Sequence, residues 1–166
     1  MPSLRGNIVI SALFTIFGGP GILLVLIPWM ITRFRVPLMQ PLWQTCLAVV
    51  LIGIGLVPLF ESIVRFIVIG SGTLVPAAPP QHLVVSGLYR FVRNPMYVGV
   101  MTALGGEALL FGSVDLFEIL LIIALGFHLF VYLYEEPKLT RTFGDEYLRY
   151  RRHVRRWIPR LTPWQG

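Results

Sequence analysis

Charged side chains are scarce in this chain. Only 13% of its 166 residues are Asp, Glu, Lys or Arg, and 55% are hydrophobic, whereas about a quarter of a soluble globular domain is charged. Its single cysteine, Cys46, excludes an internal disulfide and a cysteine-based metal site. Its histidines, His82, His128 and His153, lack the HxxxH and HExxH spacings of helical metal sites. We therefore predict an integral membrane protein without a metal centre.

Long apolar runs fill most of the chain. A helix needs about 20 residues to cross a bilayer, and four runs approach or exceed that length, at residues 7–31, 42–69, 97–114 and 116–134. We predict an all-α integral membrane fold with about four transmembrane helices in a single domain, residues 1–166. The first two spans lie in residues 1–69, and Pro20 is expected to kink the first of them. The last two should form a helical hairpin.

The basic residues indicate an orientation. Arg5, Arg90, Arg93 and the eight Lys and Arg residues between positions 138 and 160 lie on one side of the predicted spans, against two arginines after the first span. The positive-inside rule then places both termini and the polar segments in the cytoplasm. The net charge of +6 comes mainly from the C-terminal tail. We expect this tail to contact anionic membrane lipids rather than nucleic acid, because no nucleic-acid-binding fold accompanies it.

Two polar segments interrupt the apolar runs. The first is a loop of roughly twenty-five residues before the third span, a length that is usually functional or disordered in proteins. We expect it to be an ordered cytoplasmic loop. It ends in Asn94-Pro95, which predicts a helix start with Asn94 as the cap. Beside Arg90 and Arg93, such a helix N-terminus suits a carboxylate or phosphate.

The second polar segment follows the fourth span. It begins with Glu135-Glu136-Pro137 and continues with apolar and aromatic residues at helical spacing, which predicts an amphipathic helix at the membrane interface. Within the second span, Glu61 and Arg65 are four residues apart and predict an ion pair that is either structural or borders the site. Glu107, deep in the third span, lines a polar pocket or serves helix packing beside Gly105 and Gly106.

Together these features suit a zwitterionic ligand with an aromatic group. The helix N-terminus offers a seat for a carboxylate, the acid pair can accept hydrogen bonds, and Tyr89 and Tyr97 can face a sulfonium. S-adenosylmethionine has all of these groups. We therefore predict a cytoplasmic site for this cofactor.

The same segments resemble a known family. The pattern Leu-Val-x-Ser-Gly-x-Tyr, then Arg-Asn-Pro-x-Tyr-x-Gly, then Glu-Glu-x-x-Leu-x-x-x-Phe-Gly-x-x-Tyr is similar to the membrane methyltransferases typified by isoprenylcysteine carboxyl methyltransferase. Phospholipid N-methyltransferases belong to the same broad group. The resemblance covers residues 70–159 and implies a methyltransferase-like catalytic region within residues 70–166.

The resemblance also implies functional residues. The implied cofactor-binding residues are Gln81, at the margin, and His82, Leu83, Val84, Tyr89, Asn94, Pro95, Met96, Tyr97 and Glu135. Arg93 and Glu136 are the candidates for catalysis, Arg93 by orienting a ligand and Glu136 by relaying a proton from an amine acceptor. The motif alone leaves open which of Glu135 and Glu136 contacts the cofactor.

Two departures concern the acceptor. Isoprenylcysteine enzymes commonly carry His where this chain has Asn94, and an Arg that faces the substrate carboxylate where it has Val131. The expected function is methyl transfer from S-adenosylmethionine to a lipophilic acceptor at the cytoplasmic membrane face, as in the isoprenylcysteine enzymes. The alternatives are methylation of a phospholipid amine and a non-enzymatic membrane scaffold or transporter subunit. Sterol reductases, which use NADPH, share a related motif but are much longer chains.

Overall fold

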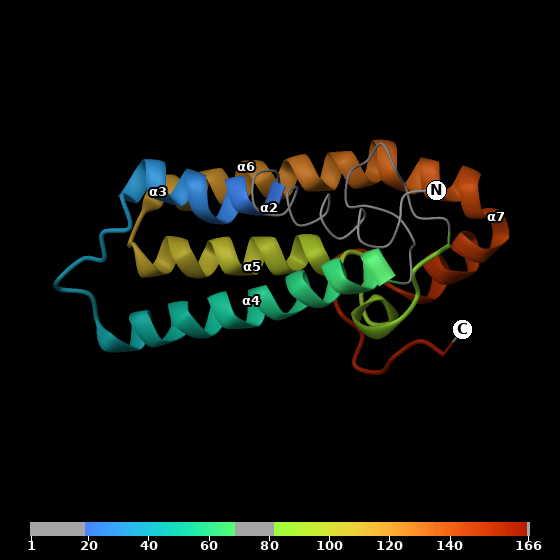
Figure 1. The fold of residues 1–166 in the computed structure, drawn as a ribbon, viewed down its shortest axis with the longest axis horizontal. Helices are drawn as coiled ribbons and strands as arrows, with labels where there is room; N and C mark the ends of the chain where they lie inside the picture. The colour runs from blue at the N-terminus through green and yellow to red at the C-terminus, as the bar shows by residue number, and fades with distance from the viewer. Residues whose placement is uncertain (1–18, 69–81, 166) are drawn as a thin grey trace.

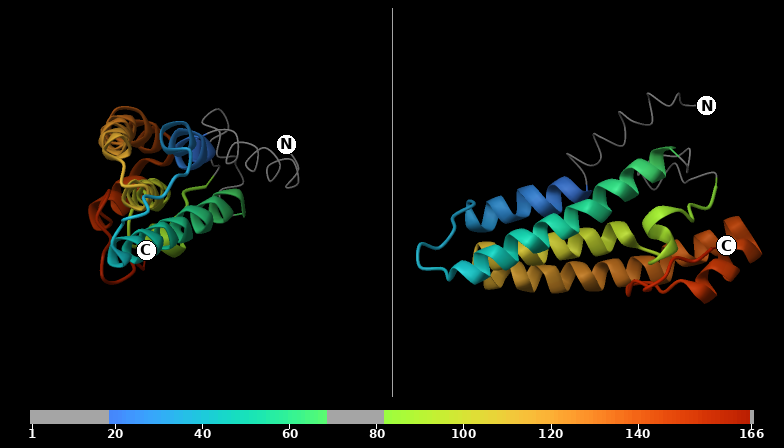
Figure 2. Two further views of the ribbon diagram at one scale, coloured as in Figure 1. Left: turned by 90° about the vertical axis from the view of Figure 1, so that its left-hand side faces the viewer. Right: turned by 90° about the horizontal axis from the view of Figure 1, so that it is seen from below.

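The computed structural model describes residues 19–68 and 82–165, and this part of the chain is helical without any strand (Figure 1). The helices form an elongated bundle, seen from its end in Figure 2. In chain order they are α2 (Gly19–Gly21), the π-helical η1 (Ile22–Leu26), α3 (Ile27–Thr32), α4 (Leu42–Val68), the 3-10 helix η2 (Gly87–Arg90), α5 (Pro95–Leu110), α6 (Val114–Phe130), the π-helical η3 (Val131–Glu135) and α7 (Glu136–His153).

Two helices are long and apolar enough to cross a membrane. One is the stretch Leu42–Arg65 of α4, and the other is the continuous helix that starts at Val114. Their outer faces carry exposed apolar side chains such as Val57, which is 66% exposed, and Leu121, which is 70% exposed, as expected for surfaces in contact with lipid. The all-α prediction is confirmed for the described residues. The count of four spans stays a prediction, because α5 and the described helix Gly19–Thr32 are shorter.

Helices α4 and α5 pack closely because glycines line their contact. A Cβ atom added to Gly55 of α4 would lie 2.5 Å from the backbone nitrogen of Ala103 and 2.6 Å from the carbonyl oxygen of Gly99. On α5, a Cβ at Gly106 would lie 2.8 Å from the carbonyl oxygen of Ala48. The prediction that this glycine permits close helix approach is therefore confirmed, whereas the neighbouring Gly105 has room for a methyl group.

The predicted hairpin is confirmed. Helix α5 ends at Leu110, α6 begins at Val114, and the two helices lie side by side (Figures 1 and 2). Gly112 takes a positive φ of 57° in the turn, and the Ser113 side chain accepts a hydrogen bond from the backbone nitrogen of Leu116 at 3.3 Å. This serine therefore caps α6.

Each π-helical turn lies just before a proline. Proline clashes with the carbonyl group four residues earlier and lacks a backbone N–H, and a wider π turn relieves that conflict. Thus η1 precedes Pro28 and η3 precedes Pro137. Pro20 itself lies in the short α2, and the π-helical η1 follows α2 directly. At Pro137 the helix continues into α7 instead of ending.

Helix α7 is amphipathic, as predicted, and its apolar face packs on the protein itself. Tyr147 and Tyr150 are buried with Val154, and Leu83 and Val85 of the polar loop pack against them. The helix has a kink at Gly144, where φ is 52° and ψ is −127°. The aromatic residues of α7 therefore hold the loop in place.

The glycine contact generates the first prediction. Replacing Gly55 with Ala should force α4 and α5 apart and destabilise the protein by about 1–3 kcal/mol, the usual cost of overpacking. The matched control is Gly53→Ala on the same helix, because a Cβ there meets nothing within 4 Å. This control should be neutral or gain about 1 kcal/mol from helix propensity. Thermal unfolding in detergent measures both variants, and equal midpoints would contradict the close contact.

Candidate cofactor site

The two polar segments meet at one end of the bundle. Figure 1 shows η2, the start of α5, and α7 at this end, together with the C-terminal residues. Residues 82–94 run from the first described position after α4 to the start of α5. The π-helical η3 brings the end of α6 to the same place. Segments that are about forty residues apart in the sequence therefore build a common site.

Tyr97 and Glu135 form the central contact. The hydroxyl of Tyr97, in the first turn of α5, donates a hydrogen bond to Oε2 of Glu135 at 3.1 Å. The ring of Phe127 lies against that of Tyr97, with centroids 4.6 Å apart. Burial, together with the nearby carboxylates of Glu135 and Glu61, raises the pKa of Tyr89 above its ordinary value. Tyr89 therefore lies near the same carboxylate and stays neutral.

Glu136 has a different environment, because neighbouring helical residues point in directions about 100° apart. Its Oε1 lies 3.0 Å from the guanidinium of Arg93 and 2.6 Å from Nε of Arg156, and its Oε2 lies 2.9 Å from the second nitrogen of Arg156. Burial alone would raise the pKa of Glu136, but the hydrogen bonds from Arg156 and the charges of Arg93 and Arg156 lower it below its ordinary value. Glu136 is therefore an ionised, buried partner of two arginines.

The C-terminal residues run along the segment that precedes α5. The backbone nitrogen of Arg93 donates to the carbonyl of Arg155 at 2.9 Å, and that of Arg160 donates to the carbonyl of Phe91 at 2.9 Å. The backbone nitrogen of Trp164 donates to the carbonyl of Arg90 at 3.0 Å. Part of the basic tail is thus a structural element of the site.

Asn94 occupies the N-cap position of α5, as predicted, but its side chain does not cap the helix. Its amide nitrogen instead donates to the carbonyl of Arg156 at 3.2 Å. The first backbone N–H groups of α5, at Met96 and Tyr97, therefore receive no cap from this side chain. Free N–H groups at a helix start favour an anion.

The structure places the predicted cofactor residues unequally. Tyr89, Tyr97 and Glu135 come together, and Asn94, Pro95 and Val84 are buried. Met96 packs against the core of Leu59, Ile63 and Val100. Leu83 turns toward α7, and His82 is exposed. Gln81 lies outside the described residues.

Two site residues were missed by the sequence analysis. Arg156 was counted only as part of the basic tail, although it forms the ion pair with Glu136. Tyr150 was seen only as an aromatic residue of an amphipathic helix, although its hydroxyl donates to the carbonyl of Tyr89 at 2.6 Å. A tail with eight basic residues gives no signal that selects one of them. The position of Tyr150 in the helical repeat predicted its face, but not its partner.

The predicted ion pair of Glu61 and Arg65 is present at the end of α4. Arg65 also donates to the hydroxyl of Ser86 at 3.1 Å. Gly87 has a positive φ of 53°, and its Cβ would collide with both members of the pair. The pair therefore borders the polar loop and fixes its course. Glu107 lies far from it, half-buried toward the other end of α5.

The comparison with known families agrees with this geometry. The model of the phospholipid methyltransferase family matches residues 43–146, which is more than half of the chain. The chain therefore belongs to the phospholipid methyltransferase family, and this membership implies a membrane methyltransferase. The expected resemblance to membrane methyltransferases is confirmed. No curated protein and no solved structure matches the chain.

The ion pairs of Glu136 generate a prediction about pH. Because the folded-state pKa of Glu136 is lowered, its contribution is fully present above the unfolded pKa of about 4.3 and is lost as the pH falls below that value. Replacing Glu136 with Gln should cost about 3 kcal/mol or more at pH 7, because two arginines lose a buried partner. The difference in stability between wild type and variant should shrink as the pH approaches 3.

Denaturation in detergent from pH 7 to pH 3 measures this difference. Glu118→Gln is the matched control, because Glu118 is exposed on α6, and its effect should be small at every pH. A gap between wild type and Glu136→Gln that stays constant across this range would contradict the ion-pair assignment.

Proposed function

We propose that the chain transfers a methyl group from S-adenosylmethionine to a lipophilic acceptor at the cytoplasmic membrane face, as isoprenylcysteine carboxyl methyltransferase does. The single observation that carries this proposal is the contact of Tyr97 with Glu135 beside Tyr89. Tyr89, Tyr97 and Glu135 come from the three separate sequence blocks that carry the resemblance. Tyr89 and Tyr97 lie at or beside the start of α5. The family match supports the reaction class.

The residues present fit the cofactor. When bound, S-adenosylmethionine supplies an electrophilic methyl group, whose bond to sulfur breaks with the electron pair staying on sulfur as the acceptor atom bonds to the methyl carbon. The carboxylate of Glu135 can accept hydrogen bonds from the amino group or a ribose hydroxyl of the cofactor. The faces of Tyr89 and Tyr97 can attract its positive charge. The uncapped start of α5 favours its carboxylate.

The remaining predicted residues complete the proposed site. His82, Leu83 and Val84 would border the cofactor from the loop, with Gln81 at the margin, and Asn94, Pro95 and Met96 would do so from the start of α5. Glu135 is the member of the acid pair that we assign to the cofactor, because Glu136 is already bound by arginines. This assignment gives each acid a separate role.

Arg93 and Glu136 remain our candidates for catalysis. Their ion pair keeps the charge of Arg93 next to the start of α5, where it can orient a cofactor carboxylate or an anionic acceptor. A carboxylate or thiolate acceptor needs no base. An amine acceptor must lose a proton, and Glu136 or a tyrosine is then the candidate relay. In either case, positioning and exclusion of water supply most of the rate enhancement.

The proposed topology has four spans, with both termini and the site in the cytoplasm. A lipophilic acceptor would then arrive from the bilayer between the helices, and the cofactor from the cytoplasm. The alternative acceptor is a phospholipid amine. It is favoured by Val131, a buried apolar residue at the position where the isoprenylcysteine enzymes carry an arginine for the substrate carboxylate.

The cofactor assignment predicts selective loss of binding. Glu135→Gln removes the negative charge of the acceptor, and Tyr97→Phe removes the donor hydroxyl of the central hydrogen bond, so each should weaken binding of S-adenosylmethionine by about tenfold or more. Calorimetric titration of detergent-purified protein measures this, with S-adenosylhomocysteine and NADPH titrated in parallel. Glu118→Gln and Tyr134→Phe are the controls, since both residues are exposed.

Unchanged affinity in both site variants would refute the site assignment. Binding of NADPH alone would transfer the chain to the reductases. If the folded protein bound none of the three ligands, the scaffold or transporter alternative would replace the enzyme.

The acceptor is identified by a transfer assay. Incubation with methyl-labelled S-adenosylmethionine and either a prenylated cysteine analogue or phosphatidylethanolamine should label the first of these. Label in the phospholipid alone would establish the amine alternative. In that case Glu136→Gln should lower the turnover number more at low pH than at high pH, because the acceptor is then an ammonium ion that must first give up a proton.

A further inference from the structure

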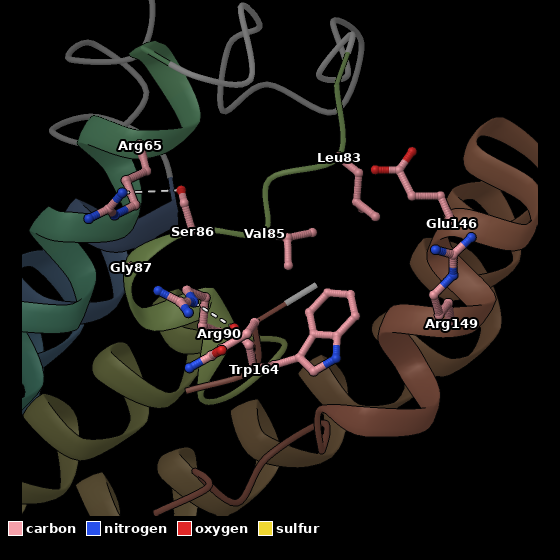
Figure 3. A pocket seen from close by; sticks show the side chains of 10 residues that line it. Arg65, Leu83, Val85, Ser86, Gly87, Arg90, Glu146, Arg149 and Trp164 are labelled. Carbon is pink, nitrogen blue, oxygen red and sulfur yellow. Dashed lines mark hydrogen bonds between the residues drawn. The ribbon is translucent and has the colours of Figure 1, made fainter. Parts of the chain in front are cut away.

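A polar cavity lies beside the proposed cofactor site. It has a volume of about 700 Å³ and opens between the polar loop, the end of α4 and α7. Figure 3 shows Arg65 and Ser86 on one side of it, Glu146 and Arg149 across from them, and Arg90 with Trp164 below. The catalytic proposal above uses none of these six residues.

The loop before η2 forms one wall of this cavity. Leu83 and Val85 turn toward α7 and line the cavity, whereas Val84, between them, is buried and does not line it. Leu83 is also one of the proposed cofactor residues, so the cavity and the proposed cofactor site adjoin at this residue.

The lining of the cavity has an excess of positive charge. Three arginines, from α4, η2 and α7, stand against a single lining carboxylate, that of Glu146. Arg65 is compensated by Glu61, and Nε of Arg90 donates to the carbonyl of Trp164 at 2.6 Å. The guanidinium of Arg149 is exposed and has no hydrogen-bond partner among residues 19–68 and 82–165. Even with Glu61 and Glu146 present, the three arginines leave a net positive charge that attracts an anion into the cavity.

The depth of the cavity indicates the source of an anion. Arg65 lies near the end of α4, four residues before the end of the apolar run 42–69, and its long side chain can reach from there to the level of the lipid headgroups. Trp164, on the cavity wall, is a residue type enriched at this interface. Phosphate groups are the anions that occur at this level in every phospholipid membrane.

We propose that this cavity binds a phosphate ester, and that the phosphate belongs to a lipid headgroup. Guanidinium groups match phosphate oxygens with paired hydrogen bonds. Arg149 supplies such a group without giving up a bond inside the protein, and the hydroxyl of Ser86 lies on the opposite wall. Leu83 and Val85 provide an apolar wall for the carbon atoms next to the phosphate.

Calorimetric titration of the full chain in a phosphate-free maltoside detergent tests the proposal. The probes are dihexanoyl phosphatidic acid, dihexanoylglycerol and glycerol 3-phosphate. We expect saturable binding of the phosphatidic acid, no binding of the diacylglycerol, and affinity about tenfold lower for Arg149→Gln, the weight of one charge-assisted contact. Arg152→Gln is the matched control, because it removes an exposed arginine of α7 that does not line the cavity. It should bind like wild type.

The outcomes separate the possibilities. Weaker binding of glycerol 3-phosphate than of phosphatidic acid supports the lipid source, and equal binding supports a soluble phosphate ester in the same cavity. Equal affinity in Arg149→Gln and wild type, an equal loss in Arg152→Gln, or binding of dihexanoylglycerol overturns the proposal. Loss of S-adenosylhomocysteine binding in Arg149→Gln also overturns it, because the cavity would then belong to the cofactor. Phosphate binding without any cofactor binding would leave this proposal standing and refute the methyltransferase site.

Discussion

The buried contact of Glu136 with Arg93 and Arg156 is the interaction on which the functional end of the molecule depends. It joins the start of α7, the segment before α5 and the C-terminal residues. Burying a carboxylate is costly unless cations and hydrogen bonds compensate it, and here both are present. The backbone bonds between residues 90–93 and the C-terminal segment reinforce it, and the first turn of α5 lies beside Glu135.

Two adjacent glutamates thereby acquire different chemistry. Glu136 is neutralised by arginines, whereas Glu135 accepts a hydrogen bond from the neutral hydroxyl of Tyr97. The difference follows from helix geometry, because consecutive side chains diverge by about 100°. The π-helical η3 ends at Glu135 and α7 begins at Glu136, so the change of helical geometry before Pro137 falls between the two acids. A carboxylate that is not held by arginines is the better partner for a ligand that is itself positively charged.

Hydrophobicity predicted more of this molecule than polar patterning did. The helix of α4 and the hairpin of α5 and α6 follow from long apolar runs and from a Gly-Ser turn, which are local signals. The motif blocks identified Tyr89, Tyr97 and Glu135 before their contact was known. The role of Arg156 was not predictable, because its partner lies 20 residues away on another element and seven similar residues compete for it. The side-chain cap expected of Asn94 is absent for the same reason, because its amide group donates instead to the carbonyl of Arg156, which is distant in sequence.

The fold and the site are stabilised by different forces. Helices α4 and α5 meet through glycines and aliphatic side chains, a contact that is insensitive to charge. The described part of the loop between them, residues 82–94, is held by Arg65, by the ion pairs of Glu136 and by the tyrosines of α7. Polar contacts near a membrane surface are specific in direction but weak once water enters. Packing therefore holds the helices together, and the exclusion of water from around Glu136 stabilises the site. Loss of this one buried charge can therefore disturb the site while α4 and α5 stay packed.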